Sequence, residues 1–144
     1  MKSEQSMAQE ARAESNPVRW MVVDDDDGVR DFIAAVLEVR GVAAVERFGS
    51  AREALEVFQA DPTQFQFVVT DLDMPGMNGI EFCRRLRAMS PELKVVLATG
   101  NDAANVGGAK QSGFCGMLSK PFPAAELWRI AEAAGVIPNA RPGL

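Results

Sequence analysis

Short apolar runs alternate with segments of helical periodicity between residues 18 and 137, and this alternation limits the fold more than any other feature of the sequence. The runs are Val18–Val23, Val42–Phe48, Phe65–Thr70, Lys94–Thr99 and Phe114–Leu118. Continuous apolar runs are typical of parallel strands that are covered on both faces. We therefore predict an α/β fold: a doubly wound five-stranded parallel sheet of flavodoxin-like order 2-1-3-4-5, with helices on both faces.

The first two connecting segments carry the clearest helix signals. In the first segment, the residues that recur at the spacing of a single helix face are Val29, Phe32, Ile33, Val36 and Leu37. Gly41 stands where a C-cap glycine would end this helix. A second helix is predicted over Ala51–Ala60, because Ser50 and Glu53 form a capping-box pattern at its start.

Three further helices are predicted over Ile80–Met89, Asn101–Ser112 and Pro123–Gly135. The first of these follows an Asn-Gly pair, which we interpret as a turn. The second contains Gly107 and Gly108, so we expect it to be the least stable element. The third starts with proline, which the first helical turn tolerates, and is predicted to bury Leu127, Ile130 and Ala134.

The two ends of the chain lack the large apolar residues that a core requires. We expect a flexible N-terminal tail over residues 1–17, one domain over 18–137 and a C-terminal tail over 138–144. No run approaches the ~20 apolar residues of a membrane span, and the first residues lack the apolar stretch of a signal peptide. The sequence predicts a cytoplasmic protein that does not enter the membrane.

Charge and residue usage exclude some classes of function. The net charge of −5 argues against direct nucleic-acid binding, which depends on a basic surface. Arg84, Arg85 and Arg87 form a basic cluster, which we interpret as a solvated helix face. The chain has no histidine, and Cys83 and Cys115 lack the spacing of a metal site, so we interpret both cysteines as small buried residues.

Polar residues stand at the carboxyl ends of four predicted strands. Asp24 and Asp25 follow the first strand, Asp71 follows the third, Thr99 ends the fourth and Lys120 follows the fifth. In a sheet of the predicted order these ends meet at one edge, where sites of such folds lie. Three neighbouring carboxylates repel one another, and a hard divalent cation relieves that repulsion. The sequence therefore predicts a Mg²⁺ site that also takes a phosphoryl group.

Phosphoryl transfer needs an in-line nucleophile and neutralisation of charge on the phosphoryl oxygens. Asp71 is the predicted nucleophile, because a carboxylate can attack phosphorus to form an acyl phosphate. Lys120 and the Thr99 hydroxyl would neutralise the oxygens. Taken singly, each of these site residues could be explained by turn or cap chemistry alone. For the neighbouring Asp26 and Asp27 we prefer such an explanation, as charges at a helix N-terminus. The coincidence of all the strand ends favours the site.

Four motifs resemble the signatures of response-regulator receiver domains in two-component signalling. They are Val22–Asp26, which is similar to the family's acidic pair, Asp71–Gly79, similar to its phosphoacceptor loop, and Leu97–Gly100 and Ser119–Phe122, similar to its two remaining signatures. The match to the family spans roughly Val18 to Gly135. Each motif alone is of moderate specificity, but four motifs in order at the family's spacing are a strong signal.

The resemblance implies a donor and a cofactor for the site. Asp71 would receive the phosphoryl group from a phosphohistidine on a sensor histidine kinase or a histidine phosphotransfer protein. Asp25, Asp71 and the backbone carbonyl of Asp73 would ligate Mg²⁺, with Asp24 acting through water.

The resemblance also implies how the remaining residues act. Thr99 and Lys120 would contact the phosphoryl oxygens, and the bond between Lys120 and Pro121 would be cis. One position departs from the family pattern, since receiver domains usually carry Tyr or Phe where this chain has Met117. Methionine changes rotamer readily, so we expect Thr99 and Met117 to form the switch with a smaller change of shape.

The output is expected to be a protein contact, because no second domain follows the last predicted helix and the chain would act as a stand-alone regulator. The family's usual signalling face combines the helix predicted over Asn101–Ser112, the strand after it and the last helix. Trp128 is a candidate exposed anchor on that face, with partial burial in the core as the alternative. We expect a monomer or a phosphorylation-dependent homodimer.

Two other functions remain open at this point. Val68–Asp73 also resembles the nucleophile motif of haloacid-dehalogenase-like phosphatases, in which the second aspartate, here Asp73, is a general acid. Against this reading, the acidic pair precedes the motif in this chain instead of following it. The second alternative is a receiver fold that binds partners without phosphorylation, and the complete set of site residues argues against it.

Overall fold

The structure is a computed structural model, and it describes residues 18–40, 43–100 and 113–137. In order, its elements are β1 (Val18–Val23), α2 (Asp27–Glu38), β2 (Ala43–Phe48), α3 (Ala51–Ala60), β3 (Phe65–Asp71), α4 (Gly79–Met89), β4 (Lys94–Thr99), β5 (Gly116–Ser119) and α5 (Ala124–Ala133). The strands form one parallel sheet in the order β2-β1-β3-β4-β5. The predicted architecture and strand order are confirmed.

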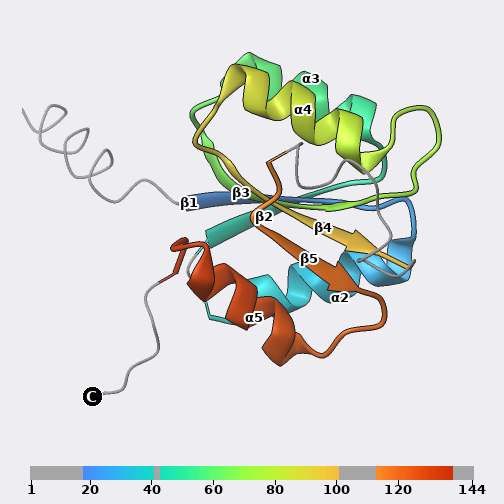
Figure 1. The fold of residues 1–144 in the computed structure, drawn as a ribbon, viewed down its shortest axis with the longest axis vertical. Coiled ribbons are helices and arrows are strands. Elements are labelled where there is room, and N and C mark those ends of the chain that lie inside the picture. Colours follow the sequence, from blue (N-terminus) through green and yellow to red (C-terminus); the bar gives the residue numbers. More distant parts are fainter. Residues whose placement is uncertain (1–17, 41–42, 101–112, 138–144) are drawn as a thin grey trace, which may run out of the picture.

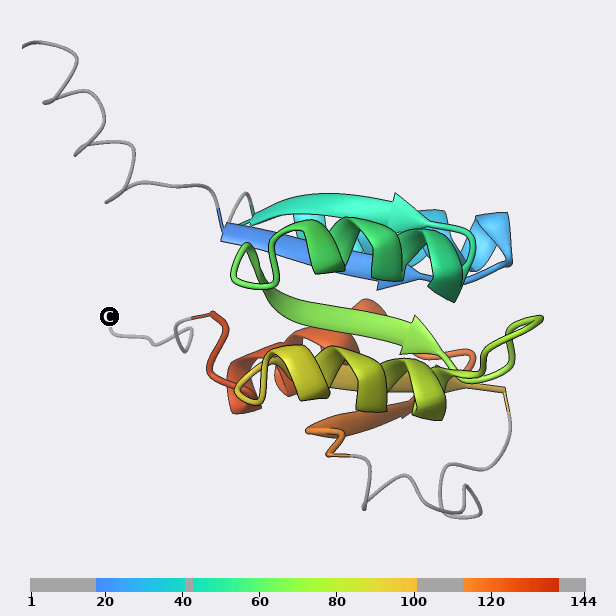
Figure 2. The same cartoon turned by 90° about the horizontal axis from the view of Figure 1, so that it is seen from above.

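Helices cover both faces of the sheet, with α3 and α4 on one face and α2 and α5 on the other (Figures 1 and 2). Strand β1 shows why its sequence is continuously apolar. Trp20 and Val22 pack in the core on the α2–α5 side, whereas Met21 and Val23 pack in the core on the α3–α4 side. All four side chains are fully buried, and burying each side chain of this size contributes about 1.5–3 kcal/mol.

Polar caps fix where three of the helices begin. The side chains of Asp26, Ser50 and Asn78 each accept a hydrogen bond from the backbone N–H three residues later, at the starts of α2, α3 and α4. Each such cap typically contributes about 1 kcal/mol. The predictions for Asp26 and Ser50 are confirmed, and Asn78, which we expected in a turn, acts as a cap.

Some element boundaries differ from the prediction. β5 begins at Gly116 instead of Phe114, and its register with β4 starts with Gly116 opposite Val96; Gly113, at φ +88°, turns the chain three residues earlier. α5 begins after its cap residue, Pro123, and ends at Ala133. α2 ends at Glu38; its predicted stop, Gly41, lies outside the described residues, as do the predicted helix over 101–112 and both predicted tails.

Three side chains are placed differently from the prediction. Phe32, at the margin of the apolar stripe of α2, is 44% exposed and packs against the ring of Phe122, with centroids 5.9 Å apart. Cys115, just before β5, is exposed, although its backbone N–H donates to the carbonyl of Val95 on β4 at 2.9 Å. Trp128 is buried, at 8% exposure, because α5 packs on α2 and the Arg40 guanidinium lies 4.1 Å from its ring centroid. The interpretation of Trp128 as an exposed anchor is therefore wrong.

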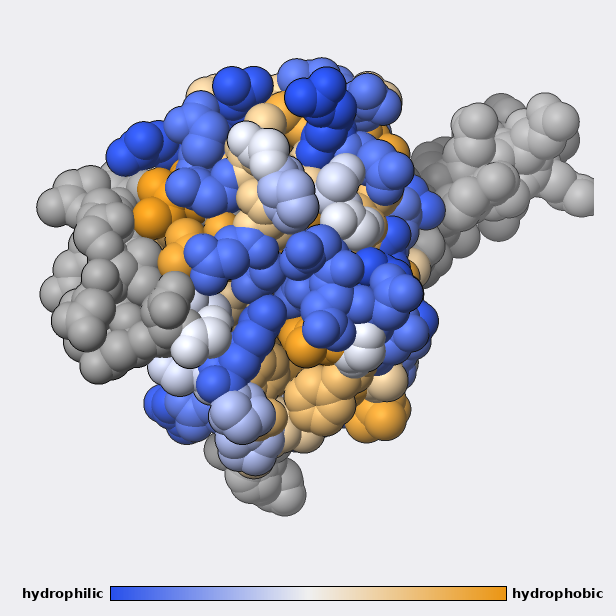
Figure 3. All heavy atoms as spheres, turned by 90° about the vertical axis from the view of Figure 1, so that its right-hand side faces the viewer, coloured by the Kyte–Doolittle hydropathy of each residue, from blue (hydrophilic) through white to orange (hydrophobic). Residues whose placement is uncertain are grey.

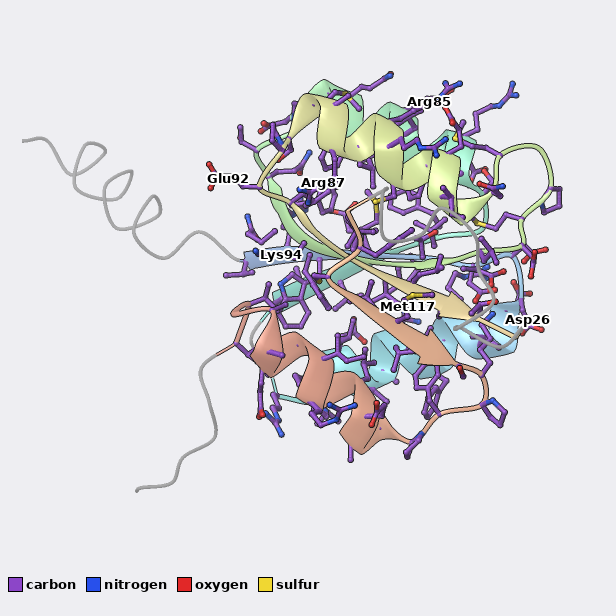
Figure 4. All side chains as sticks on the ribbon, in the orientation of Figure 1. Asp26, Arg85, Arg87, Glu92, Lys94 and Met117 are labelled. Carbon is purple, nitrogen blue, oxygen red and sulfur yellow. The ribbon has the colours of Figure 1, made fainter. Side chains whose placement is uncertain are left out.

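The basic cluster on α4 is only partly a solvated face. Arg84 and Arg85 are exposed and form ion pairs with Glu81. Arg87 instead turns towards the sheet and donates a hydrogen bond to the carbonyl of Leu93 at 2.5 Å (Figure 4). Within the described parts of the chain, no helix has the length and apolar character needed to cross a bilayer.

Candidate functional site

The polar residues predicted at the strand ends come together at one edge of the sheet. Strands β4 and β5 point to the right in Figure 1, and Figure 3 views that edge directly, with hydrophilic side chains across its centre. Asp24 follows β1, Asp71 ends β3, Thr99 ends β4 and Lys120 follows β5. Because β1 and β3 are neighbours, with Val23 opposite Thr70, the acidic residues of both strands meet.

Three carboxylates form the acidic part of this site. Each of Asp24, Asp25 and Asp71 offers an oxygen, and these oxygens all lie within 4.8 Å of one another. Asp24 and Asp71 are only 1% and 5% exposed, whereas Asp25 is exposed at the rim. The backbone N–H of Asp26 donates to Oδ1 of Asp24 at 2.9 Å, which fixes that carboxylate in the turn after β1.

Lys120 bridges two of the carboxylates. Its Nζ donates to Oδ2 of Asp24 and to Oδ1 of Asp71, at 2.9 Å in each case. Burial lowers the pKa of Lys120, but the hydrogen bonds to Asp24 and Asp71 outweigh this effect and the pKa is raised overall. The bond between Lys120 and Pro121 is cis, as predicted.

The surroundings of the Asp71 carboxyl disfavour its ionised form. Burial raises the pKa of Asp71, the hydrogen bond from Lys120 lowers it, and the charge of Asp24 raises it further, with a smaller contribution from Asp25. The net result is a raised pKa. The ionised form of Asp71 is therefore under electrostatic stress in the folded protein.

The donor atoms of the site suit a hard divalent cation. Three carboxylates face one lysine, so the cluster keeps a net negative charge when all three are ionised. Oxygen ligands with room for waters and a phosphoryl oxygen are the environment in which Mg²⁺ binds. The residues present therefore fit this ion.

The loop after β3 is held close to Asp71 by Gly79. The backbone N–H of Gly79 donates to the carbonyl of Leu72 at 2.9 Å. A Cβ at position 79 would lie 2.3 Å from the carbonyl oxygen of Asp71, a distance that no side chain tolerates. This glycine is thus required for the close approach of α4 to the end of β3, and Asp73 lies exposed on the loop between them.

Thr99 and Met117 lie on the neighbouring strands. Thr99 is fully buried at the end of β4. Met117, labelled on β5 in Figure 4, is half-buried and packs against the cluster formed by Leu72 and Leu97. Since Leu72 directly follows Asp71, Met117 touches a group of side chains that adjoins the site.

A surface pocket of about 510 Å³ lies beside the site instead of within it. Its walls come from the start of α3, the loop after β3 and the start of α4; they include Arg52, Met77 and Arg85. The carboxylate cluster and Lys120 do not line it. The cluster is the stronger candidate for chemistry, because there Lys120 bridges two buried carboxylates and the pKa of one of them, Asp71, is raised.

Arg30 is the residue of this region that sequence reasoning missed. Its Nη1 donates to the backbone carbonyl of Asp24 at 2.9 Å, and its Nη2 pairs with Oδ1 of Asp27 at 2.5 Å. The spacing of Asp27 and Arg30 could have indicated the ion pair, since residues three apart face each other on a helix. The contact with Asp24 depends on the turn and has no sequence signal.

Comparisons with known proteins agree with this geometry. The family model described as the response regulator receiver domain matches residues 20–132. The chain is 34% identical over 110 residues to the response regulator receiver protein CpdR of Brucella abortus (strain 2308), covering 76% of this chain and 89% of CpdR. It is 36% identical over 122 residues to the transcriptional regulatory protein FixJ of Azorhizobium caulinodans, covering 84% of this chain and 56% of FixJ.

Other relatives are much longer than the matched region. The C4-dicarboxylate transport transcriptional regulatory protein DctD of Rhizobium meliloti (strain 1021) is 36% identical over 114 residues, which are 78% of this chain but 24% of DctD. Among solved structures, a response regulator receiver domain protein from Clostridium thermocellum aligns with a TM-score of 0.73 and 27% identity, over 83% of this chain and 95% of that one. The chain belongs to the response regulator receiver domain family of two-component signalling.

Proposed function

We propose that Asp71 accepts a phosphoryl group from a phosphohistidine, with Mg²⁺ bound, and that a partner protein reads the phosphorylated state. The observation that most supports this proposal is the position of Lys120, whose Nζ lies 2.9 Å from both Asp24 and Asp71. A fixed cation beside a buried carboxylate of raised pKa is suited to a reaction that brings further negative charge to that carboxylate.

In the proposed reaction a carboxylate oxygen of Asp71 attacks phosphorus. The new O–P bond forms as the P–N bond of the phosphohistidine breaks, and the electron pair goes to the imidazole nitrogen, which takes up a proton from solvent. Lys120 and the Thr99 hydroxyl would then donate hydrogen bonds to the phosphoryl oxygens. Asp24, Asp25, Asp71 and the backbone carbonyl of Asp73 would hold Mg²⁺, which when bound neutralises charge on those oxygens.

The donor in this proposal is a sensor histidine kinase or a histidine phosphotransfer protein. The output is a protein contact on the side of the domain that contains β5 and α5, with Thr99 and Met117 as the switch. Support for Met117 comes from its half-buried position against the cluster of Leu72 and Leu97, because a shift at Asp71 would reach this cluster through the adjacent Leu72. Trp128 takes no part in this contact, since it is buried.

The test is incubation with Mg²⁺ and acetyl phosphate, followed by intact mass measurement. We expect a gain of one phosphoryl group in the wild type, no gain in Asp71→Asn, and an unchanged gain in the control Asp73→Asn. A wild type without the gain, or an equal gain in Asp71→Asn, would contradict the proposal. Sustained turnover of a phosphate ester that is lost in Asp73→Asn would support the haloacid-dehalogenase-like phosphatase instead.

A further inference from the structure

We propose that Arg30 is a positioning residue, which holds the turn after β1 so that Asp24 and Asp25 are placed to bind Mg²⁺. This inference rests on the function proposed above. It adds to that function a residue that lies outside the site and acts on it through the backbone.

The guanidinium of Arg30 holds the turn at both of its ends. One nitrogen, Nη1, donates to the carbonyl of Asp24, the first residue after β1, at 2.9 Å. The other, Nη2, lies 2.5 Å from Oδ1 of Asp27, the first residue of α2. Asp25 lies between these two attachment points. The planar fork of arginine can satisfy both partners at once, which a single ammonium cannot.

The surroundings of Arg30 keep its side chain in one place. The side chain is only 18% exposed. On the side of β2, a Cβ added to Gly49 would lie 3.3 Å from Nη1, so the chain after β2 passes directly over the guanidinium. The backbone N–H of Asp24 also donates to the carbonyl of Phe48 at 3.1 Å, which ties the turns after β1 and β2 together.

The position of Asp25 depends on this turn. Within the part of the chain that the structure describes, the Asp25 side chain makes no hydrogen bond or ion pair of its own. The Asp24 carboxylate is fixed partly by the Asp26 N–H, at 2.9 Å, which belongs to the same turn. Loosening the turn would therefore move two of the three carboxylates that gather within 4.8 Å.

Arg47 provides a matched control. It also joins a strand to α2, through Glu38 at 2.8 Å and Asp31 at 3.4 Å, and both of these contacts are with exposed carboxylates. Within the part of the chain that the structure describes, the Arg47 side chain makes no hydrogen bond or ion pair with the turn after β1. Replacing it removes an arginine of the same neighbourhood without releasing Asp24.

The experiment measures Mg²⁺ binding to the full chain by isothermal titration calorimetry. Residues that hold metal ligands in place typically contribute ten- to hundredfold to affinity, so we expect Arg30→Met to weaken Mg²⁺ binding by about tenfold or more. Arg30→Lys should be weakened almost as much, because it keeps the charge but loses the two-point hold. Arg47→Met should bind as the wild type does. In metal-free protein, the Asp26 amide should exchange hydrogen faster in both Arg30 variants.

Unchanged affinity in Arg30→Met would overturn the inference. Full restoration in Arg30→Lys would also overturn it, because charge alone would then explain the effect. If Arg30→Met does not fold, the Mg²⁺ affinity and the Asp26 amide exchange of Arg30→Lys decide the question. A wild type that binds no Mg²⁺ would refute the proposed function, and in that case the exchange rate of Asp26 would still decide whether Arg30 holds the turn.

Discussion

The ends of β1 and β3 and the ends of β4 and β5 supply opposite halves of one site. The first half contributes only carboxylates, from Asp24, Asp25 and Asp71. The second contributes the Lys120 ammonium, which contacts Asp24 and Asp71, and the buried Thr99 stands at the end of β4. The carboxylates of the acidic half repel one another, and both burial and the charge of Asp24 raise the pKa of Asp71. The hydrogen bond from Lys120, in the second half, lowers this pKa and so relieves part of the repulsion. The comparison teaches that charge balance in this site comes from strands that are distant in the sequence.

The two halves also differ in how firmly the fold holds them. β1 and β3 lie inside the sheet and pair with a strand on both sides, as does β4 of the second half, so the difference lies in β5. β5 is a short strand at the edge, and its Met117 is only half-buried. Elements with fewer buried contacts open at lower free energy. The firmly held Asp71 therefore faces a less constrained edge, an arrangement that suits the proposed role of the domain in reporting phosphorylation.

The largest effect is expected from removing the cation of the second half. Lys120→Met leaves the buried carboxylates of Asp24 and Asp71 without their shared partner, and breaking a buried pair in this way typically costs about 3–5 kcal/mol. The pKa of Lys120 is raised, so the stabilisation that it gives is fully present below its ordinary pKa of 10.5 and is lost only above it. Urea unfolding at pH 7 without Mg²⁺ measures the loss. Lys94→Met, at an exposed position on β4, should change stability by less than about 0.5 kcal/mol. Equal losses of stability in Lys120→Met and Lys94→Met would contradict this contrast between the two halves.

A smaller loss is expected from crowding the acidic half. Gly79→Ala would bring a Cβ to 2.3 Å from the Asp71 carbonyl oxygen, and α4 must move to accommodate it. Such overpacking typically costs about 1–3 kcal/mol. The control is Gly100→Ala, where a Cβ would meet no atom of the described residues within 4 Å. Thermal unfolding of both variants tests the prediction, and a stability of Gly79→Ala equal to that of the control would contradict it.

The smallest effect is a gain in stability from neutralising Asp71. Because the pKa of Asp71 is raised in the folded state, ionisation lowers wild-type stability as the pH rises above the ordinary value of 3.8. Asp71→Asn removes this penalty and keeps an oxygen for Lys120, so we expect higher stability at pH 7 without Mg²⁺. The difference from the wild type should shrink as the pH falls towards 3.8. Denaturant unfolding across this range measures it, and a variant less stable than the wild type at pH 7 would show that the ion pair outweighs burial.

The strands and the identities of the strand-end residues could be predicted from the sequence. A strand that is covered on both faces, such as Val18–Val23, must be apolar throughout, and so a polar residue directly after it stands out. Helix starts were also predictable where the signal is local, as with Ser50, whose cap lies three residues from its partner. These features depend on neighbours in the chain, and periodicity and spacing record such neighbours directly.

Contacts between distant segments were decided only by the tertiary structure. The sequence placed Trp128 and Phe32 on helix faces but could not say which other helix would cover them; α5 packing on α2 buried the first and left the second 44% exposed. The bridge from Lys120 to Asp24 joins residues 96 positions apart, and the hold of Arg30 on the Asp24 carbonyl depends on the shape of one turn. The sequence by itself thus determined which chemical groups stand at the strand ends, because local patterns specify secondary structure. Their distances, burial and pairing were determined by packing, which no local pattern encodes.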